Sequence, residues 1–424
     1  MKKALALFLL IFPFCLGAEI YTLRFEGPVD PLLEEYAVNS LQRIRQKGDA
    51  RLVIIAMDTP GGFDTSMRSI IKAMLNANVP VVAYVSPKGG RAASAGFFIL
   101  LAADVAAMAP GTNTGAAHPV SVTGSDIEKT MREKITNDAV SYVKALARSR
   151  GRNEELAEKA VRESRSYTAE ECLKSGLIDL VVSDTRELIG RLQGKTVKSA
   201  DGKETTLDLR GEKVVTLPMS ERQKFLRTLT NPNLAYFLLI FGLVGLFIEF
   251  THPGGMIPGI LGGISLLLAF LAFQVLPINY VGLFLILLSI GFFIAEIKVQ
   301  GFGVLGVGGI VSFVLGSTML INSPIPEMRP AMSMIISFAV CFACIFLFLT
   351  WKVFQAMKHR RETGVEGIIG ETGVAKTDID GLQGKVFVHG EWWNAVADGL
   401  IPAGSRIQVE AVNNLVLKVK KSGG

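Results

Sequence analysis

Between residues 20 and 192, short runs of aliphatic and β-branched residues alternate with longer segments whose apolar residues recur every three or four positions. The short runs predict buried strands, and the longer segments predict amphipathic helices. We expect strands at 20–25, 52–57, 79–85 and 177–182, and helices at 31–46, 64–77, 94–103 and 135–148. Because strands separated by helices usually pair in parallel, this region predicts an α/β domain with a mainly parallel sheet.

A different pattern begins after a polar stretch, 193–232, which we interpret as a linker with a strand-like piece at 213–217. Uninterrupted apolar stretches then cover 234–250, 256–276, 281–297, 302–321 and 331–351. Each approaches the roughly 20 residues that a helix needs to cross the hydrocarbon core. The sequence therefore predicts a membrane domain at 233–351 with about five transmembrane helices, a count uncertain by one.

Two pieces of the membrane domain resemble each other. Ile-Glu at 248–249 leads to Gly-Gly-Ile at 262–264, and Ala-Glu at 295–296 leads to Gly-Gly-Ile at 308–310. We interpret this as a repeated helical hairpin whose glycines allow close helix packing. A carboxylate inside a membrane suggests a functional site. Glu249 and Glu296 fall at span ends, however, so we expect them to be solvated there.

The last segment, 363–424, alternates short apolar strands with glycine turns, which predicts a small β-barrel of the OB type. Adjacent residues of a strand point to opposite faces. Of Trp392 and Trp393, we therefore expect one in the barrel core and one on its surface. Lys418, Lys420 and Lys421 form a modest basic end, and we favour a protein or membrane-surface contact over nucleic acid.

Charge and hydropathy suggest how the chain lies in a membrane. Residues 1–18 combine a basic start, an apolar stretch and small residues, as a signal peptide does, although an uncleaved anchor is the alternative. The hydrophobic content of 50% and mean hydropathy of +0.39 fit a membrane protein. Basic residues follow the last span at Lys352, Lys358, Arg360 and Arg361, within a net charge of +6. An exported N-terminal domain and a C-terminus on the cytoplasmic side both follow.

The four cysteines predict neither a disulfide framework nor a metal site. Cys15 lies in the leader, Cys341 and Cys344 lie in an apolar span, and Cys172 stands alone. This spacing does not match a zinc site. We expect no metal and no cofactor.

Candidate chemistry centres on Ser94, within Ala-Ala-Ser-Ala-Gly at 92–96, and on an earlier turn, Asp-Thr-Pro-Gly-Gly at 58–62. Both fall where a strand meets a helix, which is where sites form in α/β domains. Alone, Ser94 reads more simply as a helix N-cap. A nucleophile would also need a base and N–H donors for the oxyanion. His118 is the histidine of this domain, and Lys134, at the start of a helix, is a lysine candidate. Both bases stay open at this point.

The chain resembles the long-form NfeD proteins, membrane-bound proteases of the ClpP/SppA type with a crotonase-like fold. The matching motifs are those at 58–62 and 92–96, Met-Ala-Pro-Gly-Thr at 108–112, Lys-Ile-Thr-Asn at 134–137, Thr-Ala-Glu-Glu at 168–171, Gly-Leu-Ile-Asp at 176–179 and Gly-Glu-Trp at 390–392. The resemblance covers nearly the whole chain, and these motifs are specific as a combination.

The resemblance implies a Ser-Lys dyad, with Ser94 as nucleophile and Lys134 as general base. It also implies oxyanion N–H groups from Gly61 or Gly62 and from Ala95. His118, which precedes Pro119, lies near the place of the histidine in ClpP-type triads and remains the alternative base. The substrate implied is a hydrophobic peptide of a stomatin/prohibitin-like membrane partner. A homo-oligomer in contact with membrane lipid is expected.

The expected domains are a signal peptide at 1–18, a protease domain at 19–192, the linker, the membrane domain and an OB-type domain at 363–424. The exported protease domain and cytoplasmic barrel place the protein in the cell membrane. A rival reading is a non-catalytic membrane scaffold that organises a stomatin-like protein through the barrel. A crotonase-type acyl-CoA enzyme would share the fold, but the signal peptide argues against it because acyl-CoA is cytosolic.

Overall fold

The computed structural model describes residues 19–120, 128–198, 204–299, 303–323, 325–358, 367–381 and 383–423. The expected signal peptide at 1–18 lies outside these residues. The chain divides into two compact units, Met1–Cys341 and Phe342–Gly424.

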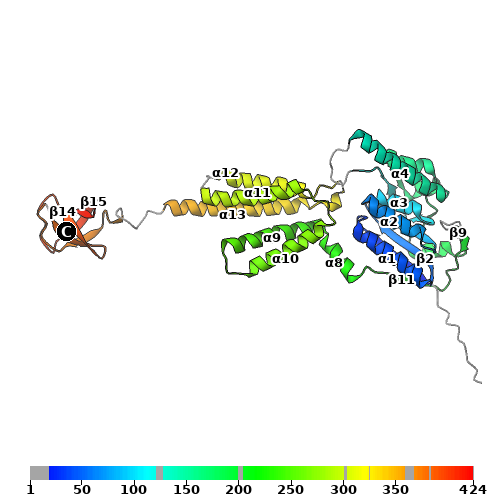
Figure 1. Ribbon diagram of the computed structural model, residues 1–424, viewed down its shortest axis with the longest axis horizontal. Coiled ribbons are helices and arrows are strands. Elements are labelled where there is room, and N and C mark those ends of the chain that lie inside the picture. Colours follow the sequence, from blue (N-terminus) through cyan, green and yellow to red (C-terminus); the bar gives the residue numbers. More distant parts are fainter. Residues whose placement is uncertain are drawn as a thin grey trace, which may run out of the picture. The chain divides into compact units, whose positions relative to one another are not determined.

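A parallel sheet forms the centre of the N-terminal domain (Figure 1). Its strand order is β11 (Lys213–Thr216), β1 (Glu19–Glu26), β2 (Ala50–Asp58), β3 (Val81–Val85), β5 (Val105–Met108) and β8 (Leu180–Val181). Every neighbouring pair is parallel. The predicted α/β class is therefore confirmed.

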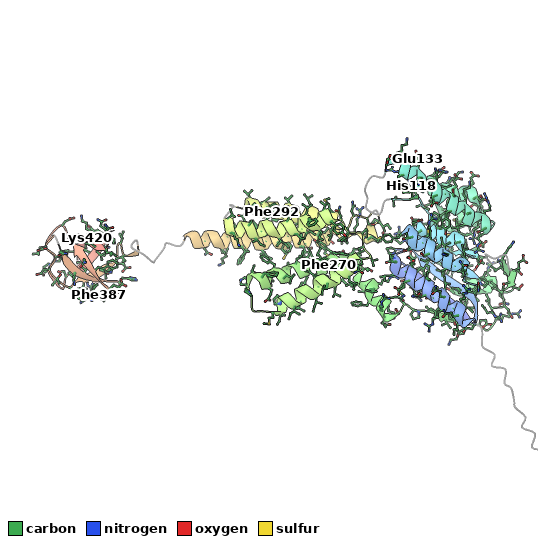
Figure 2. The ribbon with its side chains drawn as sticks, viewed as in Figure 1. His118, Glu133, Phe270, Phe292, Phe387 and Lys420 are labelled. Atoms are coloured by element: carbon green, nitrogen blue, oxygen red, sulfur yellow. The ribbon has the colours of Figure 1, made fainter. Side chains whose placement is uncertain are left out.

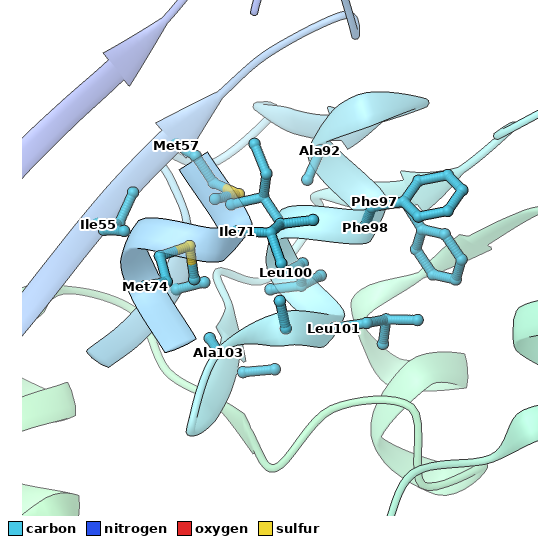
Figure 3. Packing of buried hydrophobic residues seen from close by; sticks show 14 of the residues in the cluster. Ile55, Met57, Ile71, Met74, Ala92, Phe97, Phe98, Leu100, Leu101 and Ala103 are labelled. Atoms are coloured by element: carbon cyan, nitrogen blue, oxygen red, sulfur yellow. The ribbon is translucent and has the colours of Figure 1, made fainter. Parts of the chain in front are cut away.

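Helices cover both faces of this sheet. They are α1 (Pro31–Lys47), α2 (Asp64–Leu75), α3 (Ala95–Ala102), α4 (Lys129–Ser149), α5 (Glu154–Arg162), α6 (Ala169–Lys174) and α7 (Thr185–Leu192). The larger core lies between the sheet and α1 to α6, and a smaller one lies under α7. Every residue of α3 is buried, and Figure 3 shows Leu100 of this helix beside Ile71 of α2. Helix α3 is thus an internal element of the core.

Several predicted boundaries differ from the structure. The strand expected at 177–182 shortens to β8, and α4 begins six residues before the predicted start at 135. The expected linker contributes β11, because Val215 packs against the core and the strand pairs with β1. The remainder of that segment holds β9 (Thr196–Lys198), β10 (Glu204–Thr206) and α8 (Glu221–Leu229). A small sheet of β4 (Arg91–Ala93), β6 (Asn113–Gly115) and β7 (Ser166–Thr168) was not predicted, because three-residue strands carry almost no periodic signal.

Apolar helices follow: α9 (Pro232–Thr251), α10 (Ile257–Phe273), α11 (Tyr280–Val299), α12 (Val304–Leu320) and α13 (Met332–Lys358). In the described chain, α9 and the stretch Pro326–Lys352 are long and apolar enough to cross a membrane, and the other three helices contribute shorter apolar segments. Figure 1 shows α9 and α10 as one hairpin and α11 and α12 as another. The predicted repeat therefore corresponds to two hairpins.

Glycines bring the helices of each hairpin into backbone contact. A Cβ on Gly245 would lie 2.9 Å from the Cα of Gly262, and one on Gly316 would lie 2.7 Å from the carbonyl oxygen of Gly282. Larger side chains would force these helices apart. Between the hairpins, the hydroxyl of Tyr236 donates a buried hydrogen bond of 2.9 Å to Ser317.

Glu296 is buried, contrary to the expectation of a solvated carboxylate. Its oxygens accept hydrogen bonds from the N–H groups of Gly303, Leu305 and Gly306 at 2.8, 3.0 and 3.2 Å. These N–H groups lie at the start of α12, where a helix leaves donors unpaired. The carboxylate therefore caps the second helix of its hairpin. Glu249 holds the corresponding place beside α10, and accepts from Gly254 at 3.3 Å.

The C-terminal unit contains a closed barrel with the strand order β12 (Thr372–Ala375), β13 (Gly384–Val388), β14 (Glu391–Val396), β16 (Val416–Lys421) and β15 (Arg406–Asn413). Its core includes Val386, Ile407 and Leu417. Trp392 is 63% exposed, whereas Trp393 packs against the core, as the alternation predicted. The predicted small β-barrel is confirmed.

Candidate active site

Ser94 occupies a sharp turn between β4 and α3. Its backbone has φ 51° and ψ −116°, a left-handed conformation that is unusual for a residue other than glycine. Although Ser94 holds the N-cap position, its side chain makes no capping hydrogen bond. The N-cap interpretation therefore does not explain the serine. A strained turn that leaves a hydroxyl uncommitted is typical of a functional site.

Hydrogen bonds between β4 and the end of β2 bring the two predicted motifs together. The N–H of Thr59 donates to the carbonyl of Arg91 at 2.7 Å, and the N–H of Ala93 donates back to Thr59 at 3.0 Å. Gly61, with φ 117°, then lies directly against the serine. A Cβ on Gly61 would be 2.6 Å from the Cβ of Ser94 and 3.1 Å from its Oγ. A glycine is required here because no side chain fits.

The N–H groups around this turn differ in availability. Gly61 donates to Oγ1 of Thr59 at 3.2 Å, and Ser94 donates to the carbonyl of Gly115 at 2.9 Å. Ala95 is the first residue of α3, so its N–H has no acceptor within the helix. Within the part of the chain that the structure describes, neither Ala95 nor Gly62 has a recorded acceptor for its N–H. These two groups differ in this respect from the N–H groups of Gly61 and Ser94, which already donate.

The two candidate bases are not in hydrogen-bond contact with Ser94 among the described residues. Lys134 is exposed on the first half of α4, not turned into the core. Figure 2 labels its neighbour Glu133 on the outside of the domain. His118 is half-buried, and its Nδ1 lies 3.0 Å from the carbonyl oxygen of Val161 in α5. The structure thus joins Ser94 to the glycine turn and leaves both bases apart from it.

Arginines that the sequence reading did not single out hold the opposite end of α3. Nη1 of Arg152 donates to the carbonyl of Leu101 at 2.6 Å, and Nε of Arg150 donates to that of Ala102 at 3.1 Å. Arg152 also pairs with Asp179 at 2.8 Å. Burial lowers the pKa of the Arg152 guanidinium, and the partner carboxylate opposes this effect. Cations at a helix C-terminus stabilise its unpaired carbonyls.

Replacing Arg152 with methionine is expected to lower the free energy of unfolding by about 1–3 kcal/mol, because buried carbonyls lose their donor. Thermal unfolding of the full-length protein in detergent, followed by circular dichroism, would measure this. Arg148→Met is the matched control, since Arg148 is 72% exposed in its pair with Glu154. Equal stability of the two variants would contradict the anchoring role.

A cysteine nucleophile is excluded for the N-terminal domain. Cys172 is fully buried, and burial raises the pKa of its thiol to about 12. A thiol held protonated in this way is unreactive. No group of three or more metal-ligating side chains occurs among the residues described.

Three family models match successive parts of the chain. They are described as the NfeD1b N-terminal domain at residues 19–210, the NfeD integral membrane domain at 233–352, and the NfeD-like C-terminal, partner-binding domain at 365–421.

Two curated relatives match over most of the chain. The membrane-bound protease PH1510 of Pyrococcus horikoshii is 34% identical over 423 residues, which cover 96% of this chain and 94% of that protein. The membrane protein NfeD1b of Bacillus subtilis is 26% identical, over 90% of this chain and 87% of that protein.

Solved structures match the N-terminal half. The 1510-N protease of Pyrococcus horikoshii, described as specific for a stomatin homolog, is 31% identical with a TM-score of 0.44, over 50% of this chain and 98% of that one. A lysine-to-alanine mutant of the 1510-N stomatin-specific protease, in complex with a substrate peptide, is 32% identical with a TM-score of 0.46, over 50% and 97%.

Proposed function

Since this chain belongs to the NfeD family of membrane-bound serine proteases, we propose that Ser94 is its nucleophile and Lys134 its general base. The proposal for Ser94 rests on the turn that it occupies. Its hydroxyl caps no helix, and its backbone is strained. Gly61, which has no side chain, lies directly against it. In this proposal, a peptide carbonyl carbon approaches Oγ past the glycine turn.

The oxyanion donors in this proposal are the N–H groups of Gly62 and Ala95. Both lack a recorded acceptor in the described chain, and that of Ala95 opens a helix, where partial positive charge favours an anion. Gly61 has a different role, because its own N–H already donates to Thr59. It permits close approach to Ser94.

Lys134 is favoured as base by the Lys-Ile-Thr-Asn match and by its place on α4. In the proposed reaction, Ser94 Oγ attacks the peptide carbonyl and its proton passes to the amine of Lys134, which returns it to the leaving amine. Catalytic hydrogen bonds are often long without substrate and shorten in the complex. Met131 and Ile135, exposed beside Lys134, offer apolar surface that a peptide or a second copy of the chain would cover.

The proposed substrate is a hydrophobic segment of a stomatin/prohibitin-like membrane protein. The family model for the barrel describes a partner-binding domain, and the solved Pyrococcus protease is described as specific for a stomatin homolog. We propose that the barrel binds this partner and that the protein acts as a homo-oligomer in contact with lipid.

We further propose that the protease domain lies on the exported side and the barrel in the cytoplasm. Arg91, three residues before Ser94, pairs with Glu327 in the 3-10 turn Pro326–Met328 between α12 and α13. This ion pair supports placing the turn between α12 and α13 on the same side of the membrane as the protease domain. Lys352, near the end of α13, supports a cytoplasmic end.

The strained turn of Ser94, whose side chain makes no capping hydrogen bond within the described residues, carries the proposal, and an activity-based probe tests it. The full-length protein in detergent is treated with a labelled fluorophosphonate and, in parallel, mixed with a co-purified stomatin-like protein. We expect Ser94 to be labelled, and mass spectrometry to find released apolar peptides that are absent with Ser94→Ala. An unlabelled serine together with an intact partner would favour the scaffold.

A further inference from the structure

A single arginine joins the start of α2 to the middle of α4. Nε of Arg68 lies 2.8 Å from a carboxylate oxygen of Asp64, and its Nη2 lies 2.5 Å from one of Asp138. The guanidinium also lies over the ring of Tyr142, 4.4 Å from the ring centre. One side chain thus makes three contacts, two of them with α4.

These contacts lie next to the glycine turn at the start of α2 and next to Lys134 on α4. Asp64 begins α2 two residues after Gly62, so the guanidinium is held near the glycine turn. Asp138 follows Lys134 by four residues along α4. Residues four apart lie on the same face of a helix, one turn from each other. The face of α4 that Arg68 holds is therefore the face that carries Lys134.

This part of α4 depends on polar contacts for its position. Residues 129–138 are exposed or half-buried, and buried packing of the helix begins at Ala139. At this boundary Arg68 binds Asp138 on one side. On the other side Arg162 of α5 donates to the side chain of Asn137 at 3.1 Å. The Lys134 turn lies just beyond these two contacts.

A stacked pair of rings extends the connection to the nucleophile helix. The Tyr142 ring that lies under Arg68 stacks on Phe98 of α3, with ring centres 6.0 Å apart and an angle of 22° between the planes. Phe98 follows Ser94 by four residues. Arg68, which lies on α2, therefore contacts α4 directly and is connected to α3 through the Tyr142 ring.

We propose that Arg68 is a positioning residue that orients α4 and thereby directs Lys134 toward Ser94. This inference rests on the proposed Ser-Lys dyad. Loss of the Arg68 contacts should affect the rate of catalysis more than the stability of the fold. Exposed ion pairs contribute little to folding, whereas a shift of about 1 Å in a catalytic group costs roughly 100-fold in rate.

The test compares Arg68→Met with Arg148→Met in the full-length protein, using a fluorogenic apolar peptide. Methionine keeps much of the packing volume and removes the charge. We expect Arg68→Met to lower kcat roughly 10- to 100-fold with KM little changed. Arg68→Lys, which keeps one charged contact, should recover part of this loss. Arg148→Met removes an exposed ion pair of α4 with Glu154, outside the site, and should leave kcat unchanged.

A double-mutant comparison separates positioning from general damage. If Arg68 acts through Lys134, adding Arg68→Met to Lys134→Ala should lower the residual rate of fluorophosphonate labelling no further. The inference would be overturned if Arg68→Met lowered the labelling rate by the same factor in the wild-type and Lys134→Ala backgrounds. Wild-type kcat for Arg68→Met would also overturn it. Wild-type activity of Lys134→Ala alone would remove the proposed dyad, and this inference with it, whatever the Arg68 variants do.

Discussion

Lys134→Ala is expected to lower kcat for peptide cleavage by about 10²- to 10⁴-fold, whereas His118→Ala should lower it by less than about 10-fold. A general base contributes the larger factor because the serine hydroxyl is a weak nucleophile while it keeps its proton. His118 has Nδ1 beside the carbonyl of Val161, which leaves Nε2 as its one nitrogen for proton transfer. Steady-state kinetics on purified full-length protein measure both variants.

The control for this comparison is Ser94→Ala, which should lose all cleavage above background while the fold, followed by circular dichroism, is kept. KM should change little in Lys134→Ala, because the lysine acts on the proton and not on substrate binding. The opposite pattern, full activity in Lys134→Ala and none in His118→Ala, would assign the base to His118.

Gly61→Ala is expected to reduce fluorophosphonate labelling of Ser94 by at least about 100-fold. The added methyl group would lie 2.6 Å from the Cβ of Ser94, and alanine would be strained at φ 117°. Since Ser94 lies against this position, the methyl group must displace the Ser94 side chain or close the approach to it. The measurement is the second-order labelling rate.

Gly111→Ala provides the matched control for backbone strain. Gly111 also has a positive φ, 76°, but an added Cβ would meet nothing within 4 Å. This variant should cost about 1–2 kcal/mol of stability from its left-handed conformation, with labelling at the wild-type rate. If both variants label equally fast, the glycine turn does not limit access to Ser94.

The fold could be predicted from the sequence where the hydrophobic pattern extends over several residues. The buried runs at 52–57 and 79–85 predicted β2 and β3, and the strand-helix alternation predicted a parallel sheet. The short strands β4 and β6 carry no such signal, because three residues cannot show a period. Their backbone hydrogen bonds to Thr59 and Ser94 nevertheless bring the two motifs into contact.

The motifs of the candidate site could be recognised in the sequence, whereas the side chains that support it could not. Ser94 and the glycine turn at 58–62 both fall at strand-to-helix junctions, and the family resemblance implies their roles as nucleophile and N–H donors. The backbone conformation of Ser94 and the position of the Ala95 N–H at the start of α3 could be seen only in the structure. Arg68 and Arg152 gave no signal in the sequence, because charged residues on helices usually face solvent and their partners lie 70 and 27 residues away.

The two glycine-packed hairpins have a consequence for counting membrane crossings. A hairpin returns the chain to the face at which it started, whether or not its shorter helix spans the full bilayer. In the proposed topology, the pairs α9–α10 and α11–α12 therefore add an even number of crossings. The proposed cytoplasmic position of the barrel then depends on α13 alone. On this proposal, a relative that lacked one complete hairpin would keep the same orientation, and one that lacked α13 would have both soluble domains on one side.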